Sequence, residues 1–405
     1  MFSSSKLNDQ ITIMPDKLGH GAFGSVYIAH DKINNTNVAI KCESKEKNEN
    51  LTLLREFKVC KKIYDVKKYL KCVKQQEDDT IGDTTKISNN TMILESNPTI
   101  IVYNHISKNN LLSIPTEFNI NLLINTICIP ETHKYFACTD YNYLTMELCG
   151  DNIESILEKY SFSEKSKYSI AYRLLYIMSC IHRCGIIHRD IKLSNFVLNK
   201  KIDDTDNNIL TQYDNLSPIV IDLGLAKEYY KFEGGKAVKV AMRIGKSITG
   251  TLRYISLNIH EFKSPTVVDD LISLSYALIV IFTGKTLPWV GHRKDIDKFE
   301  IHKHTQDTCK CGYHKFKAEG ITKHNNTIAD VKFHTDLDEL VGKYSFLATW
   351  IRYLYSLNFG QLPSYNILLK KLKIECNDCD DLVIELEKKT KIRVRNKAVT
   401  VVKEN

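Results

Sequence analysis

The chain has 405 residues, which is long enough for two lobes that each bury a hydrophobic core. Hydrophobic residues make up 43% and charged residues 26%, which excludes a largely disordered chain, and the net charge of +8 favours either acidic partners or simple solubility. The longest apolar run, at residues 276–282, is far too short for a membrane span, which needs about 20 residues, so we expect no membrane association.

The first part of the chain has the pattern of a small antiparallel sheet followed by a helix. Residues 11–42 alternate apolar and polar side chains around a glycine-rich turn, which predicts hairpins. Leu53, Leu54 and Phe57 are then spaced for one face of a helix over residues 51–64.

An unusual segment at residues 66–126 interrupts this first part and is rich in Lys, Asn, Thr and Ile. Within it we expect a polar loop at 75–90, while 119–129 fits either a helix or a strand. Strand patterns resume at 133–137 and 143–148.

The second part of the chain has helical patterns. A long apolar stripe runs through residues 170–181 and ends before Gly185, a typical helix stop. Residues 270–283 are almost wholly apolar and predict a helix that is buried on most sides. Further helices are expected at 350–357 and 365–372.

These patterns predict an α+β fold with a small antiparallel-sheet lobe and a larger, mostly helical lobe. The expected divisions are a tail at 1–11, a first lobe at 12–148 with the insertion at about 66–126, a second lobe at 149–375 with a Cys/His-containing insertion at about 295–335, and a charged tail at 376–405.

Gly19, Gly21 and Gly24 form a Gly-x-Gly-x-x-Gly pattern in the first hairpin. Glycines at this spacing let the backbone approach a triphosphate without a clash from Cβ, although a plain turn explains the pattern equally well on its own. The residues that follow continue as a strand, whereas a Rossmann dinucleotide site would continue as a helix. Val26 and Ala39 would supply an apolar roof for an adenine ring.

Lys41 ends an apolar strand, where an ammonium group is costly to bury unless it meets anions. Phosphate groups and a carboxylate on the next helix would provide them, and Glu56 is the best placed carboxylate in the sequence. An exposed lysine at the end of a strand is the alternative.

Polar residues typical of phosphoryl transfer follow the first long helix. Asp190, after His188 and Arg189, would accept a hydrogen bond from a substrate hydroxyl, and Lys192 would reach the γ-phosphate. Asn195 and Asp222 offer the oxygen ligands that Mg²⁺ prefers. Asp-x-Gly at 222–224 is by itself only a turn signal, but a chance match of all these spacings is improbable.

With these motifs the chain resembles the eukaryotic-type serine/threonine protein kinases of the casein kinase one and vaccinia-related kinase group, and it is closer to the casein kinase one branch. The composition and divergence are compatible with a viral member. The resemblance covers about 12–66 and 127–372, and its group-specific part is carried by Met146-Glu147-Leu148-Cys149-Gly150, Ile221-Asp222-Leu223-Gly224-Leu225-Ala226-Lys227 and Gly250-Thr251-Leu252-Arg253-Tyr254-Ile255-Ser256-Leu257-Asn258.

The resemblance implies a bilobal protein kinase fold with ATP and Mg²⁺, or alternatively Mn²⁺, in the cleft between the lobes. The backbone at Glu147 and Cys149 would bond adenine, Thr251 would bridge Asp190 and Lys192, and Asp270 would brace the catalytic loop. The ATP-binding residues that it implies are Leu18, Gly19, His20, Gly21, Ala22, Phe23, Gly24, Ser25, Val26, Ala39, Lys41, Glu56, Met146, Glu147, Cys149, Val197 and Ile221.

The chain departs from the family pattern at a few positions. Leu223 replaces the usual Phe of the metal-binding motif, which leaves metal binding in place but puts the usual switching behaviour in doubt. Relatives of this group usually need no activating phosphorylation, so we expect constitutive activity.

The resemblance also implies a basic pocket near the activation segment that favours acidic or phosphorylated acceptors. Arg253 matches a member of that pocket, and Arg243 and Lys246 lie close to it in the sequence. The alternative is that these cations balance local charge or pair with Glu228 and Glu233.

The twelve cysteines follow no disulfide framework, and the first residues lack a secretion signal, so we expect reduced thiols in a cytoplasmic or nuclear protein, or in a host cell or virion if it is viral. Cys309, Cys311 and His314 suggest zinc ligands. The first two are closer together than in most structural zinc sites, so a solvated loop is the preferred interpretation and zinc is not expected.

Three classes of function fit the sequence. A serine/threonine protein kinase ranks first because Lys41, Asp190 and Asp222 are all present. The alternatives are a pseudokinase that serves as a nucleotide-binding scaffold and a small-molecule kinase, which would lack the peptide platform at 250–251. The expected partners are protein substrates with Ser or Thr acceptors; the expected state is a monomer, and nucleic acid is not expected as a partner.

Overall fold

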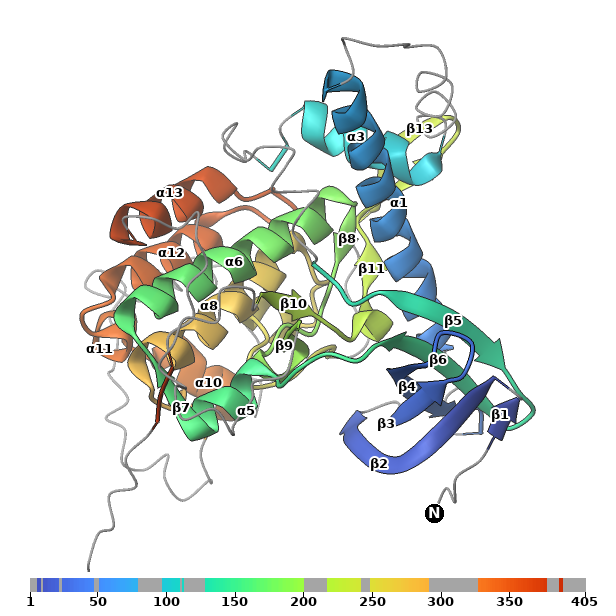
Figure 1. The fold of residues 1–405 in the computed structure, drawn as a ribbon. Helices are drawn as coiled ribbons and strands as arrows, with labels where there is room; N and C mark the ends of the chain where they lie inside the picture. The colour runs from blue at the N-terminus through green and yellow to red at the C-terminus, as the bar shows by residue number, and fades with distance from the viewer. Residues whose placement is uncertain are drawn as a thin grey trace, which may run out of the picture.

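The computed structural model describes residues 6–8, 10–21, 24–46, 51–78, 97–109, 111–112, 128–199, 217–241, 248–290, 327–376 and 386–388. Figure 1 shows a twisted sheet on one side of the molecule and a group of packed helices on the other. This arrangement confirms the expected bilobal α+β fold.

The small lobe is built on an antiparallel sheet in the order β1-β2-β3-β4-β6-β5. Side chains alternate between its faces, so Val38 and Ile40 pack into one hydrophobic cluster while Ala39 packs with Leu144 and Met146 into another. The hairpins and strands predicted in this region are confirmed. The strands are β1 (Lys6–Asn8), β2 (Ile11–Gly21), β3 (Gly24–Asp31), β4 (Thr36–Ser44), β5 (Thr132–Ala137) and β6 (Tyr141–Glu147).

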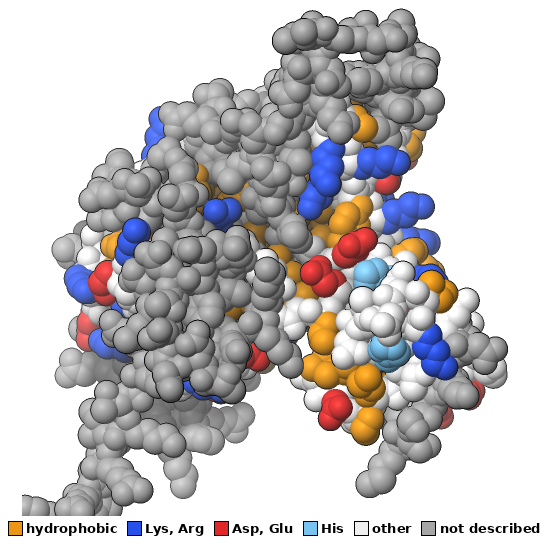
Figure 2. All heavy atoms as spheres, viewed as in Figure 1, with side chains coloured by type: hydrophobic (Ala, Val, Ile, Leu, Met, Phe, Trp, Pro, Cys, Tyr) orange, Lys and Arg blue, Asp and Glu red, His pale blue; other side chains and the backbone are white. Residues whose placement is uncertain are grey.

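Helix α1 (Thr52–Asp78) is much longer than the helix predicted for residues 51–64. It continues because Ile63, Val66 and Leu70 keep the helical spacing and join the same core as the helices of the large lobe. The helix therefore extends into the segment that we expected to be an insertion. Figure 2 shows Lys and Arg side chains (blue) over the upper right of the molecule, where α1 lies in Figure 1.

A second helix inside the expected insertion, α3 (Pro98–Lys108), was not predicted. Asn97 caps its first turn by accepting a hydrogen bond from the Thr99 backbone N–H at 2.8 Å. The apolar face of α3, which includes Ile100, Val102 and Ile106, is buried in the core shared with α1. The residues at 119–127, part of the predicted helix or strand, lie outside the described part of the chain.

The large lobe is mostly helical, and its two central helices, α6 and α8, pack against each other. Its helices are α5 (Ile153–Lys159), α6 (Glu164–Arg183), α7 (Leu257–His260), α8 (Val267–Thr283), α10 (Thr327–His334), α11 (Leu337–Val341), α12 (Ser345–Ser356) and α13 (Tyr365–Cys376). The helices predicted at 170–181, 270–283, 350–357 and 365–372 correspond to α6, α8, α12 and α13.

Short strands and single turns connect these helices and carry the polar residues of the cleft. They are β7 (Tyr160–Phe162), β8 (Ile186–Ile187), η1 (Leu193–Asn195), β9 (Phe196–Leu198), β10 (Pro218–Val220), η2 (Leu223–Leu225), β11 (Lys227–Glu228), β12 (Tyr230–Glu233), β13 (Lys236–Lys239) and β14 (Leu386–Lys388). Strands β9 and β10 pair with each other, which places residues 190–195 next to residues 221–224.

Helix α8 begins three residues earlier than predicted, at Val267, because of its cap. The Thr266 side chain accepts from the Val268 N–H, and the Asp269 carboxylate accepts from the Thr266 backbone N–H, so a reciprocal capping box starts the helix. Gly284 ends it in a left-handed conformation, with φ of 66°.

No helix in the described part of the chain is both long enough and apolar enough to cross a membrane.

Candidate active site

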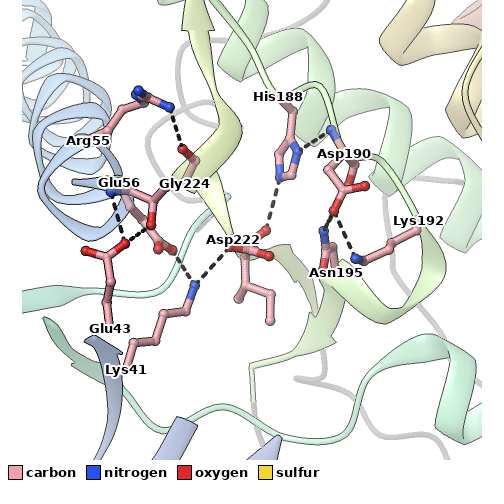
Figure 3. Close-up of polar contacts among 12 residues, drawn as sticks. Lys41, Glu43, Arg55, Glu56, His188, Asp190, Lys192, Asn195, Asp222 and Gly224 are labelled. Carbon is pink, nitrogen blue, oxygen red and sulfur yellow. Dashed lines mark hydrogen bonds and ion pairs between the residues drawn. The ribbon is translucent and has the colours of Figure 1, made fainter. Parts of the chain in front are cut away.

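Lys41, Glu56 and Asp222 meet in the cleft between the lobes, although they come from β4, from α1 and from the start of η2 (Figure 3). Lys41 Nζ lies 2.6 Å from Glu56 Oε1 and 3.4 Å from Asp222 Oδ1. The Glu56 side chain is only 3% exposed, so this ion pair is largely shielded from water. The structure thus brings together the lysine and carboxylates that the sequence placed far apart.

The charges of these three residues support one another. Burial would lower the pKa of Lys41, but the carboxylates of Asp222 and Glu56 outweigh burial and hold this pKa well above its usual value. The Lys41 ammonium holds the pKa of Asp222 below its usual value, against the effect of burial. Burial raises the pKa of the Glu56 carboxyl, and Lys41 opposes this rise. The cleft therefore favours a cation at Lys41 and an anion at Asp222.

Glu43 was missed in the sequence, although it lies two residues after Lys41 on the same face of β4. Its fully buried carboxylate accepts from the Thr52 backbone N–H at 3.1 Å and from the Thr52 hydroxyl, and it also accepts from Asn142 Nδ2 at 3.3 Å. The strand that carries Lys41 is thereby tied to the first turn of the helix that carries Glu56 (Figure 3). The only signal in the sequence was an acidic residue two positions after Lys41 in a strand with an apolar centre.

Asp190 lies at the centre of a hydrogen-bonded loop. Its Oδ2 accepts from Lys192 Nζ at 2.9 Å and its Oδ1 accepts from Thr251 Oγ1 at 2.7 Å. Asn195 Nδ2 donates to the Asp190 backbone carbonyl at 2.8 Å, which leaves the amide oxygen of Asn195 as the atom suited to a metal ion. Thr251 therefore contacts Asp190 as expected, while its expected contact with Lys192 is not among the observed hydrogen bonds.

Asp270 in α8 binds the backbone of the loop that carries Asp190. Its carboxylate accepts from the backbone N–H groups of His188 at 2.6 Å and Arg189 at 2.8 Å. Two residues that sequence reasoning missed continue the chain of contacts, because His182 Nε2 lies 3.0 Å from Asp270 Oδ2 and the other ring nitrogen of His182 is hydrogen-bonded to the Tyr365 hydroxyl. A buried network thus fixes the loop at residues 188–190 against three helices, α6, α8 and α13.

Two residues of the site adopt left-handed backbone conformations that are uncommon outside glycine, Arg189 with φ of 72° and Asp222 with φ of 68°. The Arg189 guanidinium donates to the Leu225 carbonyl, and His188 Nε2 lies 3.0 Å from the Ile221 carbonyl. These contacts connect the segment at 188–190 with the segment at 221–225 and hold both conformations in place.

A cavity of about 440 Å³ lies between the lobes, a volume within the usual range for small-molecule sites. Its apolar walls and polar end suit a nucleotide. The predicted residues that line it are Leu18, Gly19, Gly24, Ser25, Val26, Ala39, Lys41, Glu56, Met146, Glu147, Cys149, Lys192, Asn195, Val197, Ile221 and Asp222. Ala22 and Phe23 lie outside the described part of the structure, and only the backbone strand is described at His20 and Gly21.

Only glycine fits at position 24, because a Cβ atom there would collide with the Cys42 backbone carbonyl. A Cβ atom at Gly19, by contrast, would meet no atom of the described residues within 4 Å. Gly24 is therefore required by the close approach of β3 to β4, and both glycines line the cavity. The donors fit a nucleotide–metal complex, because a shielded ammonium at Lys41 and oxygen donors at Asn195 and Asp222 share this end.

The expected anion pocket is only partly described. Arg253 Nη1 lies 2.9 Å from Glu154 Oε1, so its partner is a residue that we did not predict. Arg243 and Lys246 lie outside the described residues. The alternative partners considered for these cations are engaged elsewhere, Glu228 with Lys62 and Glu233 with Lys231.

The candidate zinc residues Cys309, Cys311 and His314 also lie outside the described residues. Among the residues that are described, no group of three or more His, Cys, Asp and Glu side chains is arranged to hold a metal ion.

A family model described as the protein kinase domain matches residues 97–343, which is more than half of the chain. The chain belongs to the protein kinase family. Membership makes it a phosphotransferase that uses ATP and a divalent metal ion and acts on protein substrates. The match begins after Lys41 and Glu56, and the ion pairs of Lys41 with Glu56 and with Asp222 join these two residues to the matched part of the chain.

Proposed function

We propose that this kinase is a serine/threonine protein kinase of the casein kinase one and vaccinia-related kinase group, that it uses ATP with Mg²⁺, and that it favours acidic or phosphorylated acceptors. The observation that carries the proposal is the convergence of Lys41, Lys192, Asn195 and Asp222 on one cavity, with Asp190 hydrogen-bonded to two of its neighbours at the rim. This set is what phosphoryl transfer to a hydroxyl requires.

Each residue has a distinct role in the proposed reaction. Lys41, held by Glu56, binds the phosphate groups, while Asn195 and Asp222 would hold Mg²⁺. A bound Mg²⁺ ion supplies positive charge that offsets the charge of the triphosphate. Binding in this way aligns the donor with the acceptor, which is the main contribution of the protein to this reaction.

Asp190 accepts a hydrogen bond from the acceptor hydroxyl and orients its oxygen. The Asp190 carboxylate is ready for this role, because Lys192 and Thr251 fix one oxygen each. Lys192 stabilises the charge on the phosphoryl group during transfer. A lysine two residues after the catalytic aspartate, as in serine/threonine kinases, supports the proposed choice of Ser and Thr acceptors.

Arg253 supports the proposed preference for anionic acceptors. Its pair with Glu154 is partly exposed, with side-chain exposures of 27% and 35%, and such pairs contribute only about 0–1 kcal/mol. A substrate phosphate, which binds the guanidinium with two hydrogen bonds, would compete well with Glu154.

Labelled ATP and two acceptors, casein and a basic protein, test the proposed function. Wild-type protein is expected to label casein, and Asp190→Ala to lose about a hundredfold or more of this activity because the acceptor is no longer oriented. Equal labelling of casein by the wild type and by Asp190→Ala would show that another enzyme or mechanism is responsible.

A peptide series tests the acceptor preference separately. At moderate salt we expect phosphorylated and acidic peptides to be turned over faster than neutral ones, and we expect Arg253→Ala to reduce this difference. Equal turnover of all three peptide types by the wild type would rule out the preference while leaving the kinase activity in place.

A further inference from the structure

Lys332 in α10 is a lysine with no exposed surface. Its Nζ donates to the backbone carbonyls of Leu252 at 2.6 Å and Ile255 at 2.8 Å. Burial of an amine costs free energy and lowers the pKa of Lys332 well below its usual value. A residue that is this costly to bury needs a structural or functional reason.

The remaining surroundings of Lys332 are one histidine and two aromatic rings. Nζ lies 3.2 Å from His260 Nε2, 5.5 Å from the centroid of the Tyr276 ring and 5.4 Å from that of the Trp289 ring. The observed contacts of Lys332 with described residues include no carboxylate, so carbonyl oxygens and ring faces take the place of an ion pair. Both the charged and the neutral amine have the two N–H groups that the carbonyls require.

The carbonyls that Lys332 binds belong to a short segment beside the catalytic aspartate. This segment begins at Thr251, whose hydroxyl donates to Asp190 Oδ1 at 2.7 Å, and it ends at Ser256, which caps α7. Trp289 Nε1 donates to the Arg253 carbonyl at 2.7 Å, between the two carbonyls that Lys332 binds. The segment 251–256 is thus held at Asp190 on one side and at Lys332 and Trp289 on the other.

We propose that Lys332 is a positioning residue, which holds segment 251–256 as the platform on which the acceptor polypeptide lies. This inference rests on the proposed protein kinase activity. Leu252 is 41% exposed, while its carbonyl accepts a hydrogen bond from Lys332. Its side chain is therefore available to contact the acceptor polypeptide. Without the amine, the partly buried Leu252 carbonyl and the buried Ile255 carbonyl lose this donor, and the platform no longer has a single conformation.

Lys332→Met tests the proposal, because it keeps most of the aliphatic stem and removes the donor. We expect the ratio of casein phosphorylation to ATP hydrolysis without casein to fall about tenfold, since water as an acceptor does not use the platform. Lys343→Met is the matched control. Lys343 also lies over an aromatic ring, that of Tyr344, but its side chain is 70% exposed, and this variant should keep the wild-type ratio.

Hydrogen exchange provides a measurement that needs no acceptor. In Lys332→Met we expect faster exchange at amides 252–256 and unchanged exchange at 193–198. Unchanged exchange at 252–256, or an equal fall in casein phosphorylation and ATP hydrolysis, would overturn the proposal. Failure of the wild type to phosphorylate either protein acceptor would instead count against the proposed function, and the exchange result would still decide the role of Lys332.

Trp289→Phe covers the case in which Lys332→Met does not fold. The phenylalanine keeps a ring near Lys332 but loses the hydrogen bond to the Arg253 carbonyl. A smaller change of the same selective kind, about threefold in the ratio, is expected. A ratio equal to that of the wild type in a folded Trp289→Phe protein would overturn the proposal.

Discussion

At the scale of single residues, the site depends on charges that hold one another in place. Lys41 lies between two carboxylates, and one of them, Asp222, occupies a left-handed backbone conformation at the start of η2. The Lys41 ammonium lowers the pKa of Asp222, so this carboxylate keeps its charge to a lower pH than an ordinary aspartate does. The negative charge with which Asp222 would bind a metal ion therefore depends on Lys41 as well as on the position of Asp222 itself.

Lys41→Met should move the acid limit of metal-dependent nucleotide binding to higher pH. A carboxyl whose pKa is lowered by folding stabilises the folded state when the pH is above the pKa of the unfolded state. This contribution is lost as the pH falls through the pKa of the folded state. Removal of the ammonium raises the folded pKa of Asp222, so its charge and the metal ion are lost earlier in a titration from about pH 8 to about pH 4.

Binding of a fluorescent nucleotide in the presence of Mg²⁺ measures this limit. Lys134→Met, which removes an exposed lysine of the same sheet, is the control and should retain the wild-type limit. The same limit in Lys41→Met and in the wild type would contradict the role assigned to the ammonium.

At the scale of elements, the orientation of α1 decides whether Glu56 reaches Lys41. Glu43 anchors the first turn of this helix through Thr52, and the Arg55 guanidinium donates to the Gly224 carbonyl at 3.2 Å. Both contacts lie within one turn of Glu56. They hold the helix against β4 and against the segment that carries Asp222.

Glu43→Ala should loosen this anchor. It removes the carboxylate that accepts from the buried Thr52 N–H and from the Asn142 amide, at a cost of about 1–3 kcal/mol in the free energy of unfolding. We also expect a higher KM for ATP, because Glu56 is displaced from Lys41. Urea unfolding and initial rates at varied ATP concentration measure the two effects.

Two variants make this experiment specific. Thr52→Val keeps the backbone bond to Glu43 and should have a smaller effect, and Glu46→Ala, at an exposed position after the same strand, should have none. An unchanged KM for ATP in Glu43→Ala would show that the anchor contributes to stability alone.

At the scale of the whole molecule, α3 joins parts that are distant in the chain. It packs against α1, α6 and the β12–β13 hairpin (Figure 1). The fit is close, because a Cβ atom at Gly185 would lie 2.7 Å from Val102 Cγ1 and 3.1 Å from the Tyr230 carbonyl oxygen. The rings of His105 and Tyr230, whose centroids are 5.4 Å apart, extend this contact. Helix α3, which lies inside the expected insertion, is thus part of the core.

Val102→Asp should destabilise the whole protein. Val102 is 4% exposed and packs in a hydrophobic cluster, so the burial of a carboxylate at this position costs several kcal/mol. A lower melting temperature and a loss of kinase activity at physiological temperature are the expected results. Ile367→Asp, at a position that is 53% exposed, is the matched control. A melting temperature like that of the wild type would show that α3 is dispensable.

Much of the fold and the site was predictable because local spacing carries it. The alternation of residues 11–42 and the apolar stripe of α6 follow the periods of a strand and a helix, and the motifs at Lys41, Asp190 and Asp222 keep fixed distances along the chain. Side chains spaced at the period of a strand or a helix predict that element from the sequence alone. The two lobes therefore agree with expectation, and Lys41 and Asp222 line one cavity.

The unpredicted features depend on partners far away in the chain. The anchor at Glu43, the pair of Arg253 with Glu154 and the burial of Lys332 follow no local period, and each exists only once its lobe has folded. Helix α3 has a local cap at Asn97, but its place in the core depends on α1 and α6. A lysine or glutamate in a sequence looks like a surface residue because burial of its charge is costly. Only the packed chain supplies the carbonyls, amides and rings that offset this cost.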